Sequence, residues 1–345
     1  MEQFNLGGNA QLIIRDNVLA VTSETGLTAV SSAIFNGGFK KVKAVLNVGV
    51  PEGYNDRFLH MDPLELITSS AQKLNLTKDY LAMVTAAKIK NYALAIKKAG
   101  GFSVSVAATA GCSHGESSGE SMDVEESPGT INIIVFIEGN PTDSCLISSL
   151  ITATEAKSAA LRDFDVRSLY TGDSATGSIT DSVTVATTNL GKNIVYGGPA
   201  SKLGQMVGYC TRKAVIEALL KQEPIWACRT VLDRLKERHL TLEKLAAEIS
   251  KIDGLAAAAK TLAEILNKNP YSLIYLLAAA KIDDDLKKNL VPVDLKNIGQ
   301  LSKDFGSFIL SEKDCSKMYG YDLVDLPPFL KNALIKTVLL NMKNS

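Results

Sequence analysis

Histidine and cysteine are scarce in this chain of 345 residues, which contains three histidines and five cysteines. No two of the cysteines have CxxC spacing, and they are spread over positions 112, 145, 210, 228 and 315. A zinc site needs three or four ligands, and with so few histidines and such scattered cysteines it would have to rely on carboxylates. A disulfide framework uses an even number of cysteines. We therefore expect no resident metal, no disulfides and a reducing, cytoplasmic location.

The chain also has a net charge of zero, because its 37 basic residues balance its 37 acidic residues. This balance gives no electrostatic reason to expect a nucleic acid or an anionic membrane as partner. Apolar runs stay shorter than the roughly 18 residues of a membrane span. The N-terminus has neither the basic nor the apolar region of a secretory signal. The sequence therefore predicts a soluble protein whose partner is a small molecule.

The glycine motifs of nucleotide-binding proteins are absent as well. No G-x-x-x-x-G-K-[ST] stretch occurs, which excludes a P-loop, and no G-x-G-x-x-G stretch follows a predicted strand. The function must therefore be sought in other patterns.

Hydrophobic periodicity predicts an α/β domain over residues 1–222. Period-two runs predict strands, and longer segments with apolar residues every three or four positions predict helices. Thr142 or Asp143 is expected to cap one of these helices. Alternation of strands and helices indicates a layered α/β or α+β sandwich. The predicted strands cover 11–15, 18–22, 43–50, 102–109, 130–137 and 182–187, and the predicted helices begin at 63, 142 or 143, and 205.

Residues 224–345 have a different sequence pattern, because apolar residues recur with helical periodicity in nearly every stretch. Pro224 disfavours a helix at the residue before it, so we place the domain boundary there. The sequence thus predicts a separate all-helical C-terminal domain.

Three stretches rich in glycine and hydroxyl groups adjoin predicted strands. They cover residues 109–114, 129–132 and 176–182. Glycine lets backbone N–H groups approach a ligand closely, and hydroxyl groups add donors and acceptors. If the strands bring the three stretches together, they can bind a carbonyl oxygen and stabilise an oxyanion.

Eight collinear stretches over about residues 20–222 resemble the adenosylcobinamide amidohydrolase (CbiZ) family. They are NGG with AVLNVGVP, TAA, VAATAGCS, PGTINIIVFIEG, PTD, TATEAKSAAL, ATGSITDSVTVA and GGPASKLGQMVG. The resemblance implies hydrolysis of the amide between the aminopropanol arm and a corrin propionate of adenosylcobinamide, giving adenosylcobyric acid for cobamide synthesis. It implies a corrinoid substrate, mainly in archaea and some bacteria.

A weaker resemblance, over residues 129–189, is to the DmpA/ornithine acetyltransferase (ArgJ) group, and it implies an αββα sandwich. No matching Gly-Asn-Ser or Ala-Thr self-cleavage site stands in the right place, so we do not expect self-processing. The chain departs from the CbiZ pattern at His114, where an Asn is common.

Amide hydrolysis requires a nucleophile, an oxyanion site and an acid for the leaving amine. Ser113 or Thr176 could attack, or Asp181 or Glu155 could activate water; Cys112 is a third option. Lys157 could protonate the amine after burial lowers its pKa. The candidates for substrate binding are Asn36, Gly37, Gly38, Gly111, His114, Thr130, Asn132, Gly177, Ser178 and Thr180.

Two alternatives stay open at this point. One is a non-catalytic corrinoid-binding or regulatory protein. The other is a bifunctional enzyme, because some family members are fused to an α-ribazole phosphate phosphatase. In that case Asp283, Asp284 and Asp285 could chelate Mg²⁺, although three acids at a helix edge are usually a solvated face. An accessory role or homo-oligomerisation is the simplest expectation for the helical domain.

Overall fold

The computed structural model describes residues 2–51, 62–120, 130–241, 270–290 and 304. The chain divides into two compact units, Met1–Cys228 and Arg229–Ser345, and each is described by itself. The division falls shortly after the boundary that the sequence predicts at Pro224.

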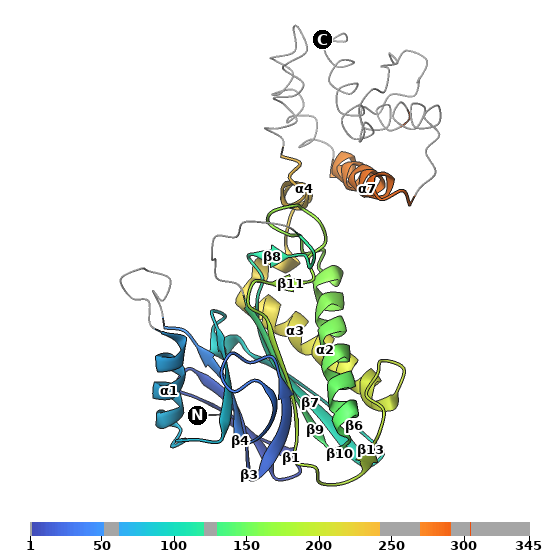
Figure 1. Cartoon of the computed structure of the whole chain (residues 1–345). Helices are drawn as coiled ribbons and strands as arrows, with labels where there is room; N and C mark the ends of the chain where they lie inside the picture. The colour runs from blue at the N-terminus through green and yellow to red at the C-terminus, as the bar shows by residue number, and fades with distance from the viewer. Residues whose placement is uncertain (1, 52–61, 121–129, 242–269, 291–303, 305–345) are drawn as a thin grey trace. The chain divides into compact units, whose positions relative to one another are not determined.

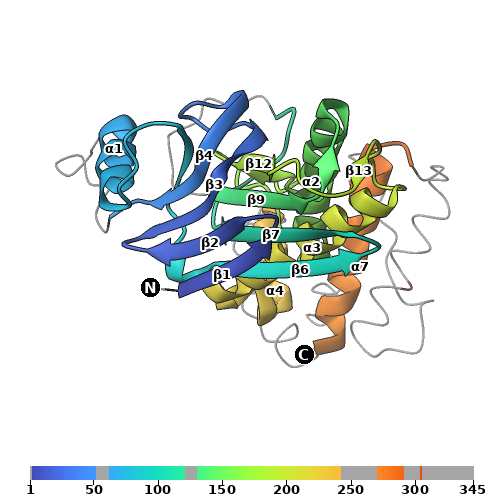
Figure 2. The same cartoon turned by 90° about the horizontal axis from the view of Figure 1, so that it is seen from below.

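The first unit contains one large sheet of nine strands with the order β1-β2-β3-β12-β9-β7-β6, and β4 and β5 follow from β3 (Figures 1 and 2). Its strands are β1 (Glu2–Gly7), β2 (Ala10–Arg15), β3 (Val18–Ser31), β4 (Gly38–Gly49), β5 (Tyr80–Thr85), β6 (Ala93–Ala99), β7 (Phe102–Gly111), β9 (Thr130–Glu138) and β12 (Ser182–Thr187). Short strand pairs outside this sheet are β8 (Gly115–Glu116) with β11 (Gly177–Ser178), and β10 (Asn140–Pro141) with β13 (Asn193–Ile194).

The sheet curls back on itself at β3. The N-terminal half of β3 pairs with β2, its C-terminal half pairs with β12, and β4 runs antiparallel along both halves. The register between β3 and β4 shifts between Thr22 and Leu27, and an irregularity of this kind bends a strand. The curl brings β1–β5 over the face of β7, β9 and β12, and an apolar core including Leu12, Val45 and Phe136 fills the space between.

Helices cover the two outer faces. The helix α1 (Pro63–Lys73) packs on β4 and β5 through Leu66, Ile67 and Ala71. Helices α2 (Asp143–Asp163) and α3 (Lys202–Gln222) cover the face of β7, β9 and β12 that carries Ile131, Ile133 and the other odd-numbered residues of β9. The unit is therefore an α-β-β-α sandwich, and the α/β prediction is confirmed (Figure 2).

Local sequence signals explain several boundaries. Asp16 and Asn17 adopt φ of 51° and 62° in the turn between β2 and β3, a conformation that Asx residues tolerate. Asp62 caps α1 and Thr142 caps α2 by accepting backbone N–H groups. The strand β9 is central, as its β-branched run predicts, because it lies between β12 and β7.

The second unit is described in part. It contains α4 (Val231–Glu237), whose capping box joins Thr230 and Asp233, and α7 (Pro270–Lys287). The other helical stretches that the sequence predicts, within 242–269 and 291–345, lie outside the described residues. Among the helices that the structure describes, none has the length and apolar character needed to cross a membrane.

Candidate functional site

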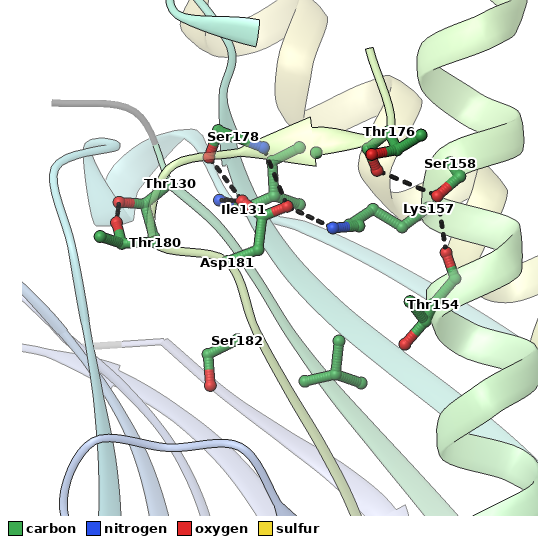
Figure 3. Close-up of polar contacts among 12 residues, drawn as sticks. Thr130, Ile131, Thr154, Lys157, Ser158, Thr176, Ser178, Thr180, Asp181 and Ser182 are labelled. Atoms are coloured by element: carbon green, nitrogen blue, oxygen red, sulfur yellow. Dashed lines mark hydrogen bonds and ion pairs between the residues drawn. The ribbon is translucent and has the colours of Figure 1, made fainter. Parts of the chain in front are cut away.

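The three hydroxyl-rich glycine stretches meet at one end of the sheet. Gly111 at the end of β7 pairs with Thr130 at the start of β9. Thr130 Oγ1 lies 2.8 Å from Thr180 Oγ1, which joins the second stretch to the third. The pairing of β11 with β8 ties Gly177 and Ser178 to the segment after β7. Residues far apart in the sequence therefore form one polar cluster (Figure 3).

Asp181 is the hub of this cluster. Its Oδ1 accepts the backbone N–H of Ile131 at 2.9 Å and the Ser178 hydroxyl. Its Oδ2 accepts the backbone N–H of Ser178 at 3.1 Å and forms an ion pair with Lys157. Each carboxylate oxygen thus has two donors, as a buried charge requires. Through these bonds Asp181 fixes the start of β9, the strand β11 and the helix α2 relative to one another.

Lys157 reaches this hub from the C-terminal half of α2, with its ammonium group directed at Asp181 (Figure 3). Its side chain is 9% exposed and that of Asp181 is 10% exposed. Burial of two charges costs free energy unless they are paired and hydrogen-bonded. Gly177 leaves the room that the pair needs, because a Cβ there would lie 2.5 Å from Asp181 Oδ2 and 2.7 Å from Lys157 Nζ.

A second polar group lies on the other face of β9, between the two layers of the sheet. The Asn132 amide donates to Asn47 Oδ1 at 2.8 Å and to the Val84 carbonyl at 2.9 Å. Asn47 in turn donates to Thr109 Oγ1 at 2.9 Å. The three side chains are buried, and Asn132 Oδ1 accepts no hydrogen bond from the described residues. The sequence interpretation includes Asn132, and Thr109 begins one of the three hydroxyl-rich stretches, but it misses Asn47, which carries no signal beyond a polar residue inside an apolar strand.

Glu223 is a further polar residue that the sequence interpretation misses. It follows α3, and its carboxylate accepts the backbone N–H of Cys112 at 3.1 Å and that of Ser113 at 3.3 Å. The indole N–H of Trp226 donates to Glu223 Oε2 at 2.5 Å. The N–H groups that the sequence assigns to an oxyanion site near Gly111 are thus bound to a carboxylate of the protein.

The remaining candidates lie around or away from the hub. Thr176 Oγ1 accepts the Ser118 backbone N–H at 2.9 Å, and Ser113 is exposed. Glu155 is exposed on α2 and lines the groove described below. His114 is half-buried, and burial, followed by the charge of Glu120, raises the pKa of Glu116 two residues further on.

Asn36 and Gly37 end the connection between β3 and β4, and Gly38 begins β4. Asn36 has a φ of 54°, and its amide donates to the Tyr80 carbonyl at 3.0 Å. Gly37 lies against the backbone of Ala33, where a side chain would collide. The contacts of Asn36 and Gly37, and the φ of 88° at Gly38, give these residues a structural role that is separate from the predicted role in substrate binding.

Cys112 lies next to the hub, with its sulfur 4.0 Å from the Gly177 carbonyl oxygen. Burial, and then the charges of Asp181 and Glu223, raise the pKa of its thiol far above the usual range. A thiolate is the nucleophilic form of cysteine, and this environment opposes it.

We therefore expect Cys112→Ala to keep activity within about threefold of the parent protein, whereas loss of a nucleophile costs several orders of magnitude. Turnover of the substrate after alkylation with iodoacetamide gives the second measurement. Exposed Cys228 should react quickly and buried Cys112 only as fast as the protein unfolds. Inactivation that tracks modification of Cys112 would restore the cysteine mechanism.

A groove of about 1040 Å³ lies between α2 and α3, on their outer surface. Leu150, Ile151, Tyr209 and Ile216 supply its apolar lining, and Glu155 and Arg212 supply charge. The hub residue Asp181 does not line it. In the part of the chain that the structure describes, no three His, Cys, Asp or Glu side chains are placed to hold a metal ion. In α7, Asp283 is buried and Asp285 pairs with Lys281 instead.

Among solved structures, the chain is similar to a β-aminopeptidase of a Burkholderia species. The match has a TM-score of 0.34 and 10% sequence identity, and it covers 63% of this chain and 82% of that one. A likeness of this size says nothing about chemistry.

Sequence comparison is more informative. The model of the family described as adenosylcobinamide amidohydrolase (CbiZ) matches residues 5–226. An uncharacterized protein of Methanocaldococcus jannaschii is 30% identical over 209 residues, covering 54% of this chain and 81% of that protein. An adenosylcobinamide amidohydrolase of Methanosarcina mazei is 29% identical over 216 residues, covering 61% of this chain and 94% of that protein. This chain therefore belongs to the adenosylcobinamide amidohydrolase family, and it is a hydrolase that acts on amides.

Proposed function

We propose that this protein hydrolyses the amide between the aminopropanol arm and the corrin propionate of adenosylcobinamide. The products are adenosylcobyric acid and aminopropanol. Membership of the family supports this substrate, and the Asp181 hub supports the site of the chemistry. One observation carries the proposal. The Ser178 hydroxyl, the Asp181 carboxylate and the Lys157 ammonium group converge at one end of the sheet.

Ser178 is the hydroxyl that already contacts the hub, because its O–H donates to Asp181 Oδ1. In our mechanism Asp181 takes this proton as Ser178 Oγ attacks the amide carbon. The C–N bond breaks, and Lys157 gives a proton to the leaving nitrogen. Water then hydrolyses the ester, returning one proton to Lys157, while Asp181 gives its proton back to Ser178 Oγ.

The other hydroxyl candidates are less well placed for this role. Thr176 Oγ1 is engaged with Ser118, and its carbonyl oxygen accepts the Ser158 hydroxyl at 2.9 Å. The Ser113 backbone N–H is bound to Glu223. Thr130 and Thr180 bind each other beside the hub, where they can orient the substrate amide.

The test compares release of aminopropanol from adenosylcobinamide by the parent protein and by Ser178→Ala, Ser113→Ala and Thr176→Val. Loss of a nucleophile lowers kcat by a factor of about 10³ or more, and we expect this for Ser178→Ala alone. A mass increase on Ser178 in acid-quenched samples would identify the ester. Tight binding of adenosylcobinamide with no release of aminopropanol would instead favour the corrinoid-binding alternative.

A further inference from the structure

The end of α3 presents a carboxylate to the segment that follows β7. Glu223 Oε1 accepts the N–H groups of Cys112 and Ser113, and Oε2 accepts the same Cys112 N–H at 3.2 Å. Trp226 holds Oε2 from the other side through its indole N–H. Successive backbone N–H groups that point into one concavity form a nest, which binds anions.

The helix itself does not favour this position. Glu223 is the C-cap residue of α3, a helix of 21 residues, and the negative end of a helix dipole repels a carboxylate. Its backbone has left the helical conformation, with φ −137° and ψ 78°. The N–H groups of Cys112 and Ser113 therefore supply the attraction that holds the carboxylate there.

The nest lies at the end of the sheet that holds the candidate site. It directly follows Gly111, which pairs with Thr130, and the Cys112 sulfur contacts the carbonyl of Gly177. Asp181 and Glu223 both act on the Cys112 thiol, so the nest and the hub flank the same buried residue. Ser113 is exposed and Glu223 is half-buried, so this part of the site borders solvent.

Amide hydrolysis forms a carboxylate where the amide carbonyl was. Resting on the proposed function, we propose that the Cys112–Ser113 nest binds the carboxylate of the product, and that Glu223 is an internal carboxylate which occupies the nest and gives way to it. The nest is then a binding site for aliphatic carboxylates, and Glu223 tunes how tightly the product is held.

Trp226 reports directly on this exchange, because it is the one tryptophan of the chain and its N–H binds Glu223. The experiment titrates the full-length protein with sodium propionate and follows tryptophan emission. Propionamide, a neutral molecule of the same shape, is the control ligand, and sodium chloride keeps the ionic strength constant. We expect a saturable change with propionate and none with propionamide.

Glu223→Gln sharpens the test. The amide oxygen can still accept the N–H groups, but a neutral acceptor forms bonds about half as strong as a charged one. Propionate should therefore saturate this variant at a concentration about fivefold lower than the parent protein needs. In Glu223→Ala, where the nest is empty, saturating propionate should raise Tm by about 3 °C.

Equal responses to propionate and propionamide, or the same propionate midpoint in the parent protein and in Glu223→Gln, would overturn the proposal. So would an unchanged Tm of Glu223→Ala with propionate. None of these readouts needs turnover. If the protein binds propionate at the nest but releases no aminopropanol from adenosylcobinamide, only the proposed function is refuted. If the protein releases aminopropanol but propionate does not displace Glu223, only the nest proposal is refuted.

Discussion

Asp181→Asn is expected to lower kcat/KM for adenosylcobinamide by a factor of about 10³, which lies within the usual range for loss of a positioned acid or base. The amide can still accept the Ser178 hydroxyl or the Ile131 N–H, but it cannot take a proton from Ser178. The amide nitrogen of the asparagine also places a hydrogen-bond donor where Asp181 Oδ2 accepts from the Lys157 ammonium group. The loss should therefore appear mainly in kcat, with KM changed little.

Glu155→Gln is the matched control. It makes the same chemical change on an exposed carboxylate of α2 that lines the outer groove. Its kcat should stay within about twofold of the parent value, since surface changes rarely alter the fold or the site. Circular dichroism of both variants checks that the first remains folded. A folded Asp181→Asn protein with full activity would remove the hub from the mechanism, and an inactive Glu155→Gln would move the chemistry to the groove.

Much of the sandwich can be predicted from local pattern. The strand over 182–187 and the N-caps at Asp62 and Thr142 follow from alternation and from side chains that accept N–H groups. These features depend on residues within a few positions of one another. The curl of β3 does not, because the sequence gives no local sign of where a long strand changes partners.

β6 and β5 were also not predicted, and the reason is physical. β6 reads ALAIKKA, where alanine and lysine favour a helix, and its pairing with β7 overrides that propensity. β5 is a nearly continuous buried run, YLAMVT, which is covered on both faces and therefore does not alternate. Tertiary contacts decide both cases.

The sequence predicts that the three glycine stretches can meet if their strands are neighbours, and the structure brings them together at one end of the sheet. The sequence places Ser178 among the substrate-binding residues, and in the structure its hydroxyl contacts Asp181. Glu155 is exposed to solvent, whereas Lys157, two residues further along α2, is buried. Helical spacing alone separates these two neighbours, but it does not show which of them points inward. Glu223 marked only a domain boundary in the sequence, because its partners at 112 and 113 are more than 100 positions away.

Lys157→Met is expected to destabilise the first unit by about 3–5 kcal/mol, because it leaves the buried Asp181 carboxylate without its counter-ion. Both side chains are about one-tenth exposed, so solvent screens this charge little. Methionine fills a similar volume, which limits the loss of packing. The measurement is urea unfolding followed by Trp226 emission, which reports on this unit.

The double variant Lys157→Met, Asp181→Asn separates charge from packing. Removing both charges should return about 2 kcal/mol of the loss, a coupling typical of residues in direct contact. The recovery should be incomplete, because an asparagine side chain at this position cannot accept from all three of the groups that Asp181 binds besides Lys157, namely the Ile131 N–H, the Ser178 N–H and the Ser178 hydroxyl. A loss in the double variant equal to the sum of the losses in the two single variants would mean that the ion pair adds nothing, and that the hub is held by its hydrogen bonds to Ile131 and Ser178.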